Sequence, residues 1–205
     1  MKWVDTNKGD KKQPEYRCRL VAKEITKDKR EDLFAATPPL EAKKIWFSLF
    51  ASMPGMSLDF GDVVRAYFHA KARRRVFVDL PKEDHEEGKC GLLKKSMYGT
   101  RDAAQNWELE YTEMMTEAGF KQGSHSVCAF YHAEKNVRVV VHGDDFASLG
   151  TNQSLDWFRG VMQKRMEVKF KNRLERGKPG SVRILNRIVT VTKDGLEYEA
   201  DQRHA

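Results

Sequence analysis

The sequence has little of what marks secreted, membrane-spanning or zinc-stabilised proteins. Its 205 residues include only three cysteines, and their odd number and wide spacing match neither a zinc site nor a disulfide framework: Cys18, Cys90 and Cys128. We therefore expect a reducing compartment and cysteines that serve as small buried hydrophobic side chains. No apolar run approaches the ~20 residues of a membrane helix. The N-terminal stretch is charged throughout, unlike a signal peptide, and internal repeats are absent.

The overall composition is typical of a soluble globular protein with one large domain or two small ones. Hydrophobic residues make up 40% of the chain and charged residues 33%. The formal net charge of +7 is compatible with a polyanionic partner such as nucleic acid. Many proteins without such a partner are equally basic, so charge alone leaves the partner open.

Hydrophobic periodicity predicts helices interleaved with antiparallel strands, and therefore an α+β fold. Helices are expected at 40–53, at 102–119 with Gly119 as the stop, and at 155–166 with Ser154 as the cap. Strands are expected at 16–25 and 73–81, and two or three more within 126–150. The basic stretch 169–180 is predicted to be a loop, and 182–200 a hairpin that turns at 193–195.

Three aspartates lie in apolar surroundings, where an unpaired carboxylate is costly: Asp62, Asp144 and Asp145. Carboxylates that gather raise one another's pKa unless a cation neutralises them. Mg²⁺ is the natural cation, because it prefers oxygen ligands and needs only a few carboxylates besides substrate phosphates. Taken alone, however, "GDD" is more typical of a hairpin turn. Asp59 also fits an exposed acid at the end of a strand.

Three longer segments resemble, in order, the polymerase motifs of copia-type LTR-retrotransposon reverse transcriptases. They are "LDFGDVVRAYFHAKARRRVFVDLP", "CGLLKKSMYGTRDAAQNW" and "VHGDDFASLG"; upstream, "KWVDTNKGD" and "YRCRLVAKE" also resemble the family. The resemblance implies a right-hand polymerase palm, an antiparallel sheet that carries the carboxylates with helices packed on one face. It also implies a fingers subdomain and a largely absent thumb. The division expected is fingers at 1–37 and 70–102, palm at 38–69 and 103–192, and the start of a truncated thumb or connection at 193–205.

The resemblance implies RNA-directed DNA polymerase activity with two Mg²⁺ ions, for which Mn²⁺ would be a substitute. Asp62 and Asp144 would bridge the ions, Asp145 would assist at the primer end, and the Val63 carbonyl would be a further ligand. The reaction is attack of a primer 3′-hydroxyl on the α-phosphate of a nucleotide, which positioning and charge neutralisation can catalyse. Residues 182–186 resemble the strand that grips the primer.

Seven further residues are expected to bind the substrate on the same resemblance: Ala66, Tyr67, Tyr98, Gly99, Arg17, Arg19 and Lys23. Viral RNA-dependent RNA polymerases also carry "GDD", but they have an aspartate at the fifth residue after the first catalytic one. Tyr67 stands there, and its ring would exclude a ribose 2′-OH and favour deoxynucleotides. Tyr67 also fits a core aromatic. Arg17, Arg19 and Lys23 are equally consistent with the solvent-exposed face of a strand. The basic runs at 71–75 and 169–178 are consistent either with contacts to nucleic-acid phosphates or with an ordinary solvated surface.

Several positions depart from the family pattern: His142, Ala104, Arg74, Arg75 and Asn186. They indicate a divergent lineage or a decaying genomic copy, so a catalytically silent nucleic-acid-binding relic of the polyprotein is the alternative function. An RNA-synthesising polymerase is a third, which Tyr67 argues against. Expected partners are an RNA and DNA primer-template, dNTPs and the remaining Pol domains, RNase H and integrase, with no membrane. The expected location is intracellular, in a cytoplasmic virus-like particle or the nucleus.

Overall fold

The computed structural model describes residues 1–25 and 33–200, which form two compact units. Each unit is built from two separate stretches of the chain. Met1–Ala35 and Arg65–Tyr111 form the first, and Ala36–Val64 and Thr112–Ala205 form the second. That these units are the fingers and the palm of a polymerase remains a prediction.

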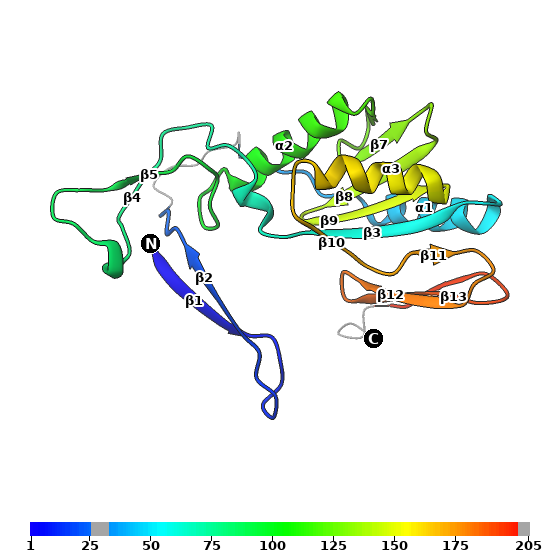
Figure 1. Cartoon of the computed structure of the whole chain (residues 1–205), viewed down its shortest axis with the longest axis horizontal. Helices are drawn as coiled ribbons and strands as arrows, with labels where there is room; N and C mark the ends of the chain where they lie inside the picture. Colours follow the sequence, from blue (N-terminus) through cyan, green and yellow to red (C-terminus); the bar gives the residue numbers. More distant parts are fainter. Residues whose placement is uncertain (26–32, 201–205) are drawn as a thin grey trace. The chain divides into compact units, whose positions relative to one another are not determined.

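An antiparallel sheet is the centre of the second unit (Figure 1). Its strands occur in the order β10 (Val168–Phe170), β3 (Ser57–Val63), β9 (Asp145–Gly150), β8 (Val137–His142), β7 (Ala129–His132) and β6 (Lys121–Gln122). The short β11 (Leu174–Glu175) pairs with β3 beyond β10. The expected loop at 169–180 is thus partly strand, because the main chain there pairs with β3, which the polar side-chain pattern does not reveal.

Helices cover both faces of this sheet, whereas one covered face was expected. On β3, Leu58 and Phe60 pack into a core shared with Phe47 of α1 (Leu40–Ser52). Asp59 points to the other face, where Arg159 of α3 (Asn152–Gln163) binds it. β3 is therefore covered on both sides, and six of its seven residues are buried although two of the seven are aspartates.

A second sheet closes the core on the α1 side of β3. It consists of β12 (Gly180–Ile184), β13 (Arg187–Val191) and β14 (Leu196–Tyr198), and Figure 1 shows the β12–β13 pair across β3 from α3. The region expected to be one hairpin is a three-stranded meander, since a further turn occurs at Leu185 and Asn186. Both turn residues have positive φ, 46° and 62°, as a type I′ hairpin turn requires.

The predicted helices are found, with a correction at one cap. Thr151, not Ser154, caps α3: its hydroxyl oxygen accepts a hydrogen bond from the Ser154 N–H at 3.3 Å. The helix expected at 102–119 is α2 (Ala103–Glu117), and Gly119 follows it with φ of 92°, the left-handed conformation typical of a helix stop.

Besides the first part of α2, the described residues of the first unit form two small antiparallel pairs and two single-turn helices. The pairs are β1 (Lys2–Asn7) with β2 (Tyr16–Val21), and β4 (Phe77–Val78) with β5 (Gly91–Leu92); the turns are η1 (Ala66–Phe68) and η2 (Lys82–Asp84). An ion-pair network joins its two stretches, since Arg74 binds Glu24 at 2.6 Å and Asp102 at 3.0 Å. In neither unit do the described residues form a helix long and apolar enough to cross a membrane.

Candidate active site

Asp62 and Asp145 lie directly opposite each other on neighbouring antiparallel strands, β3 and β9. Side chains of directly paired residues leave the sheet on the same face, with Cβ atoms about 4.5–5.5 Å apart. The pairing continues outward to Lys169 on β10, beside Asp62, and to His142 on β8, beside Asp145. Four strands thus place two carboxylates side by side between a lysine and a histidine.

The other aspartate of "GDD" occupies the turn between β8 and β9. His142 pairs with Asp145, so Gly143 and Asp144 form a two-residue hairpin, with Gly143 at φ of 64° in the position where such turns favour glycine. The backbone N–H of Val63 donates to the Asp144 carbonyl at 2.9 Å, which fastens this turn to the end of β3. Asp144 is exposed. The register partner of Asp62 is therefore Asp145. That Asp62 and Asp144 bridge the metal ions stays a prediction.

The carboxylates act on each other electrostatically. Burial raises the pKa of Asp145, and the neighbouring charges of Asp144 and Asp62 raise it further. Lys171 opposes this rise, because its Nζ lies 3.6 Å from Asp145 Oδ1 and favours the ionised form. A carboxylate whose pKa is raised by neighbouring carboxylates marks a site that attracts a cation.

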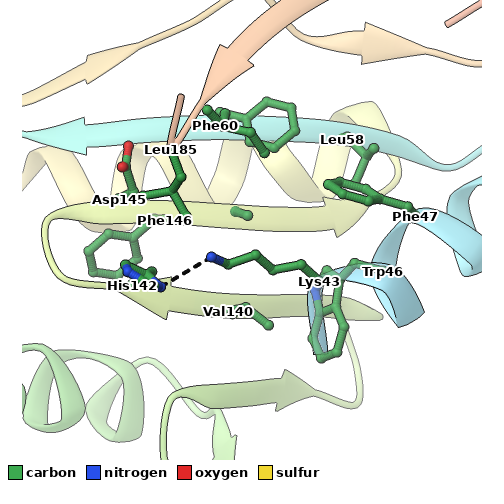
Figure 2. Close-up of a pocket in the computed structure, with 12 residues that line it drawn as sticks. Lys43, Trp46, Phe47, Leu58, Phe60, Val140, His142, Asp145, Phe146 and Leu185 are labelled. Carbon is green, nitrogen blue, oxygen red and sulfur yellow. Dashed lines mark hydrogen bonds between the residues drawn. The ribbon is translucent and has the colours of Figure 1, made fainter. Parts of the chain in front are cut away.

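A lysine and a histidine line the same pocket as Asp145 (Figure 2). Figure 2 shows Lys43 extending from α1 to His142, whose Nδ1 lies 3.1 Å from Lys43 Nζ. Burial lowers the pKa of Lys43, and burial together with the Lys43 charge lowers that of His142. Because the ammonium donates to Nδ1, a neutral His142 carries its proton on Nε2.

Sequence reasoning missed Lys43, although a signal exists. Lys43, Phe47 and Phe50 follow the spacing of one helix face, and both phenylalanines are buried in the core. A lysine on that stripe must extend along the core to reach a polar partner. The apolar wall beside it is completed by residues of α1, β3 and the β12–β13 turn, among them Trp46, Phe60 and Leu185.

The side chains of this site supply only some of the ligands that a magnesium ion needs. Among the described residues no three His, Cys, Asp or Glu side chains converge as a ready-made metal site. Mg²⁺, however, is commonly held by one or two carboxylates together with waters and substrate phosphates. The facing pair Asp62 and Asp145 meets that smaller requirement, and Asp144 adds negative charge at the adjoining turn.

Four of the expected substrate-binding residues come together in the first unit. Tyr67 packs on Tyr98 with ring centroids 4.6 Å apart, and the Arg19 guanidinium lies 5.3 Å from the centre of the Tyr98 ring. Gly99 has φ of 88°, and a Cβ there would lie 2.0 Å from the Ala22 carbonyl oxygen. Its freedom from a side chain thus lets Tyr98 and Gly99 approach the residues that follow β2, where the Ala22 N–H donates to the Tyr98 carbonyl at 2.8 Å.

The remaining expected residues differ in exposure. Arg17 and Lys23 are exposed, whereas Ala66 is buried in η1. In the basic runs, Arg74 is held by Glu24 and Asp102, and Arg173 by Asp59 and Asp156. These two arginines therefore form ion pairs within the protein, unlike the side chains of a freely solvated basic surface.

Asp59 is not an exposed strand-end acid. It is 2% exposed, Arg159 binds both of its carboxylate oxygens at 2.6 Å, and Arg173 adds a contact at 3.0 Å. Since Asp59 lies one residue from Phe60 and faces α3, this cluster is on the opposite face from Asp62 and Asp145. It fastens α3 and the segment after β10 to the sheet that carries the carboxylates.

Comparisons with known proteins match most of the chain. The family model described as reverse transcriptase (RNA-dependent DNA polymerase) matches residues 1–176. A retrovirus-related Pol polyprotein from transposon TNT 1-94 of Nicotiana tabacum is 24% identical over 180 residues. That match covers 82% of this chain but 14% of the polyprotein, so the chain spans about one seventh of its relative's length. No solved structure matches the chain.

Proposed function

Because the chain belongs to the reverse transcriptase (RNA-dependent DNA polymerase) family, we propose that it carries the active site for template-directed DNA synthesis in a retrotransposon Pol polyprotein. The reaction transfers a nucleotide from a dNTP to a primer 3′-hydroxyl, on an RNA or DNA template. The site acts inside the cell, in a virus-like particle or the nucleus. RNase H and integrase domains of the polyprotein are its expected neighbours.

The pairing of Asp62 with Asp145 across β3 and β9 carries the proposal. These two residues come from different motifs, far apart in the sequence, and the sheet brings them to one face with Asp144 at the adjoining turn. A turn without function has no need of a second acid across the strand, since like charges directly opposite each other destabilise a sheet. A bound cation would remove this repulsion, because both carboxylates would then be its ligands.

Asp62 and Asp145 would hold Mg²⁺ between them, with Asp144 and the Val63 carbonyl as further ligands. When bound, two such ions lower the pKa of the attacking hydroxyl and stabilise the leaving pyrophosphate. The chain itself supplies fixed geometry: β3 and β9 hold the carboxylates, and the Val63 N–H holds the turn at the Asp144 carbonyl. Proximity and charge neutralisation are the main requirements of such a transfer.

The cluster of Tyr67, Tyr98, Gly99 and Arg19 would bind the incoming nucleotide, with Ala66 behind it. Arg17 and Lys23, which are exposed cations, would contact its triphosphate. Support for a role in sugar selection comes from Tyr67 being a bulky ring held by Tyr98, five residues after Asp62. A packed ring discriminates between sugars better than a mobile one, because it cannot turn aside at little cost.

Primer extension tests this function. The full chain is supplied with an RNA template, a DNA primer and dNTPs, in Mg²⁺ and separately in Mn²⁺. We expect extension by the wild type, its loss in Asp62→Asn and in Asp145→Asn, and unchanged extension in Asp194→Asn. Asp194 is an exposed acid in the same unit and serves as the matched control for charge.

Two outcomes would reject the proposal. Salt-sensitive binding of primer-template without extension in either metal would identify the silent nucleic-acid-binding alternative. Extension that survives both substitutions would place the chemistry at other residues.

A further inference from the structure

Lys171 connects a candidate catalytic carboxylate to the strand that resembles a primer grip. Its side chain begins one residue after β10, where its own N–H donates to the Phe60 carbonyl at 2.9 Å. Its Nζ donates to the carbonyl of Arg183, on β12, at 3.0 Å. The same Nζ lies 3.6 Å from Oδ1 of Asp145 on β9. One ammonium thus touches both sheets of the second unit.

Partial burial and the surrounding charges strengthen the electrostatic interaction between Lys171 and Asp145. About a third of the Lys171 side chain and a quarter of the Asp145 side chain are exposed, at 31% and 25%. Water screens such a pair less than it screens a fully solvated one. Asp62 and Asp144 add negative charge to the surroundings of Asp145, and Lys171 is the cation that most strongly favours its ionised form. Lysine suits this position, because its ammonium is a compact charge on a flexible stem.

We propose that Lys171 is a built-in counter-cation for Asp145, which balances the carboxylate charges before a divalent cation binds and withdraws from Asp145 when one does. The Arg183 carbonyl remains as a partner for the withdrawn ammonium. This inference rests on the proposed function, since it requires that Asp145 bind the cation. It adds a positioning residue, outside the three quoted motifs, that links cation binding to the β12–β13 hairpin.

Removing the charge of Lys171 therefore strengthens cation binding. The entering cation no longer has to displace the ammonium or approach a like charge, and we expect an affinity about three- to tenfold higher, as a modest like-charge repulsion at a partly exposed site predicts. Lys171→Gln removes the charge and keeps a donor for the Arg183 carbonyl. Lys171→Met removes both the charge and the donor. Lys171→Arg keeps the charge and serves as the conservative variant.

Mn²⁺ binding to the full chain tests the proposal without relying on polymerase activity. Free Mn²⁺ is measured by electron paramagnetic resonance at pH 8 and low salt, for the wild type and each variant. We expect tighter binding in Lys171→Gln and Lys171→Met and wild-type affinity in Lys171→Arg. Lys178→Met removes an equal charge from an exposed side chain that pairs with Glu175 rather than with Asp145, so it is the matched control and should bind like the wild type.

The outcomes separate this inference from the proposed function. If the wild type binds Mn²⁺ and Lys171→Gln binds it equally well, the counter-cation role is wrong and the proposed function stands. If the wild type binds no Mn²⁺, both are wrong. If Lys178→Met tightens binding as much as Lys171→Gln, only net charge matters and the specific role of Lys171 is rejected.

A second measurement covers the protein free of metal. A double-mutant cycle of Lys171→Gln and Asp145→Asn, made in EDTA and read by urea unfolding, gives the coupling between the two side chains. We expect a favourable coupling that shrinks as salt is added. A coupling of zero in low salt would overturn the proposal even if a variant bound metal differently.

Discussion

Asp62 on β3 is the direct antiparallel partner of Asp145 on β9. This pairing places two like charges side by side on one face of a sheet, with a third at the turn that Asp144 occupies. Such an arrangement costs stability when no cation is present. The same face that is suited to a divalent cation is therefore expected to be a weak point of the metal-free fold.

Asp145→Asn should make the metal-free protein more stable near neutral pH. The folded pKa of Asp145 is raised, chiefly by burial, above an unfolded value of about 3.8. Between these two values the folded chain binds more protons than the unfolded chain, so wild-type stability falls as pH rises through that window. The advantage of the amide should therefore be largest above the folded pKa and vanish toward pH 4. Urea unfolding in EDTA across this pH range measures it, and an advantage independent of pH would contradict the cause given.

Asp59→Ala should destabilise the second unit by about 3 kcal/mol, because it leaves the partly buried guanidinium groups of Arg159 and Arg173 without their shared carboxylate. Lys178→Ala, which breaks an exposed pair, should cost less than about 1 kcal/mol. Urea unfolding of the full chain compares the two. Equal losses would mean that the Asp59 cluster is no stronger than a surface ion pair.

Gly99→Ala should destabilise the first unit more than Gly88→Ala does. Both glycines have positive φ, 88° and 73°, but only at Gly99 would a Cβ meet backbone, the Ala22 carbonyl oxygen at 2.0 Å. The left-handed conformation alone costs about 1–2 kcal/mol, and displacing the backbone of Ala22, just after β2, adds about 1–3 kcal/mol. Limited proteolysis and urea unfolding of both variants measure the difference. Similar losses of stability in the two variants would show that the backbone at Ala22 moves aside at no cost in free energy.

Tyr67→Val should let ribonucleotides compete with deoxynucleotides, with selectivity for the deoxy sugar lowered about tenfold or more. The smaller side chain no longer fills the space that a 2′-OH would occupy. Phe68→Leu is the control, since it also removes a ring from Tyr98, 5.5 Å away, but leaves Tyr67 in place. Single-nucleotide incorporation with paired dNTP and rNTP measures the ratio. A ratio that moves equally in both variants would assign the effect to loss of packing.

Local features of the chain could be predicted because their causes are local. The apolar stripe of α1 and the stop at Gly119 follow from helical spacing and from the conformational freedom of glycine. The "GDD" turn follows from a glycine between two apolar runs. The motif resemblance identified the family, which the comparison over residues 1–176 confirms.

Other features depend on partners distant in the sequence, and no local pattern specifies them. Asp59 and Asp62 are three residues apart on one strand and face opposite sides of the sheet, so one binds arginines under α3 and the other meets Asp145. Lys171 lies in a segment that resembles a loop, yet its position beside Asp145 follows from pairing with β3.

The sequence by itself determined that three aspartates occur in polymerase-like motifs, which helices and turns surround them, and which family the chain belongs to. Tertiary structure decided that Asp145 rather than Asp144 stands opposite Asp62, and that Lys43 and Lys171 border the site. The physical reason is strand register. A shift of one residue moves every side chain of a strand to the other face, and that register is set by packing across the whole sheet.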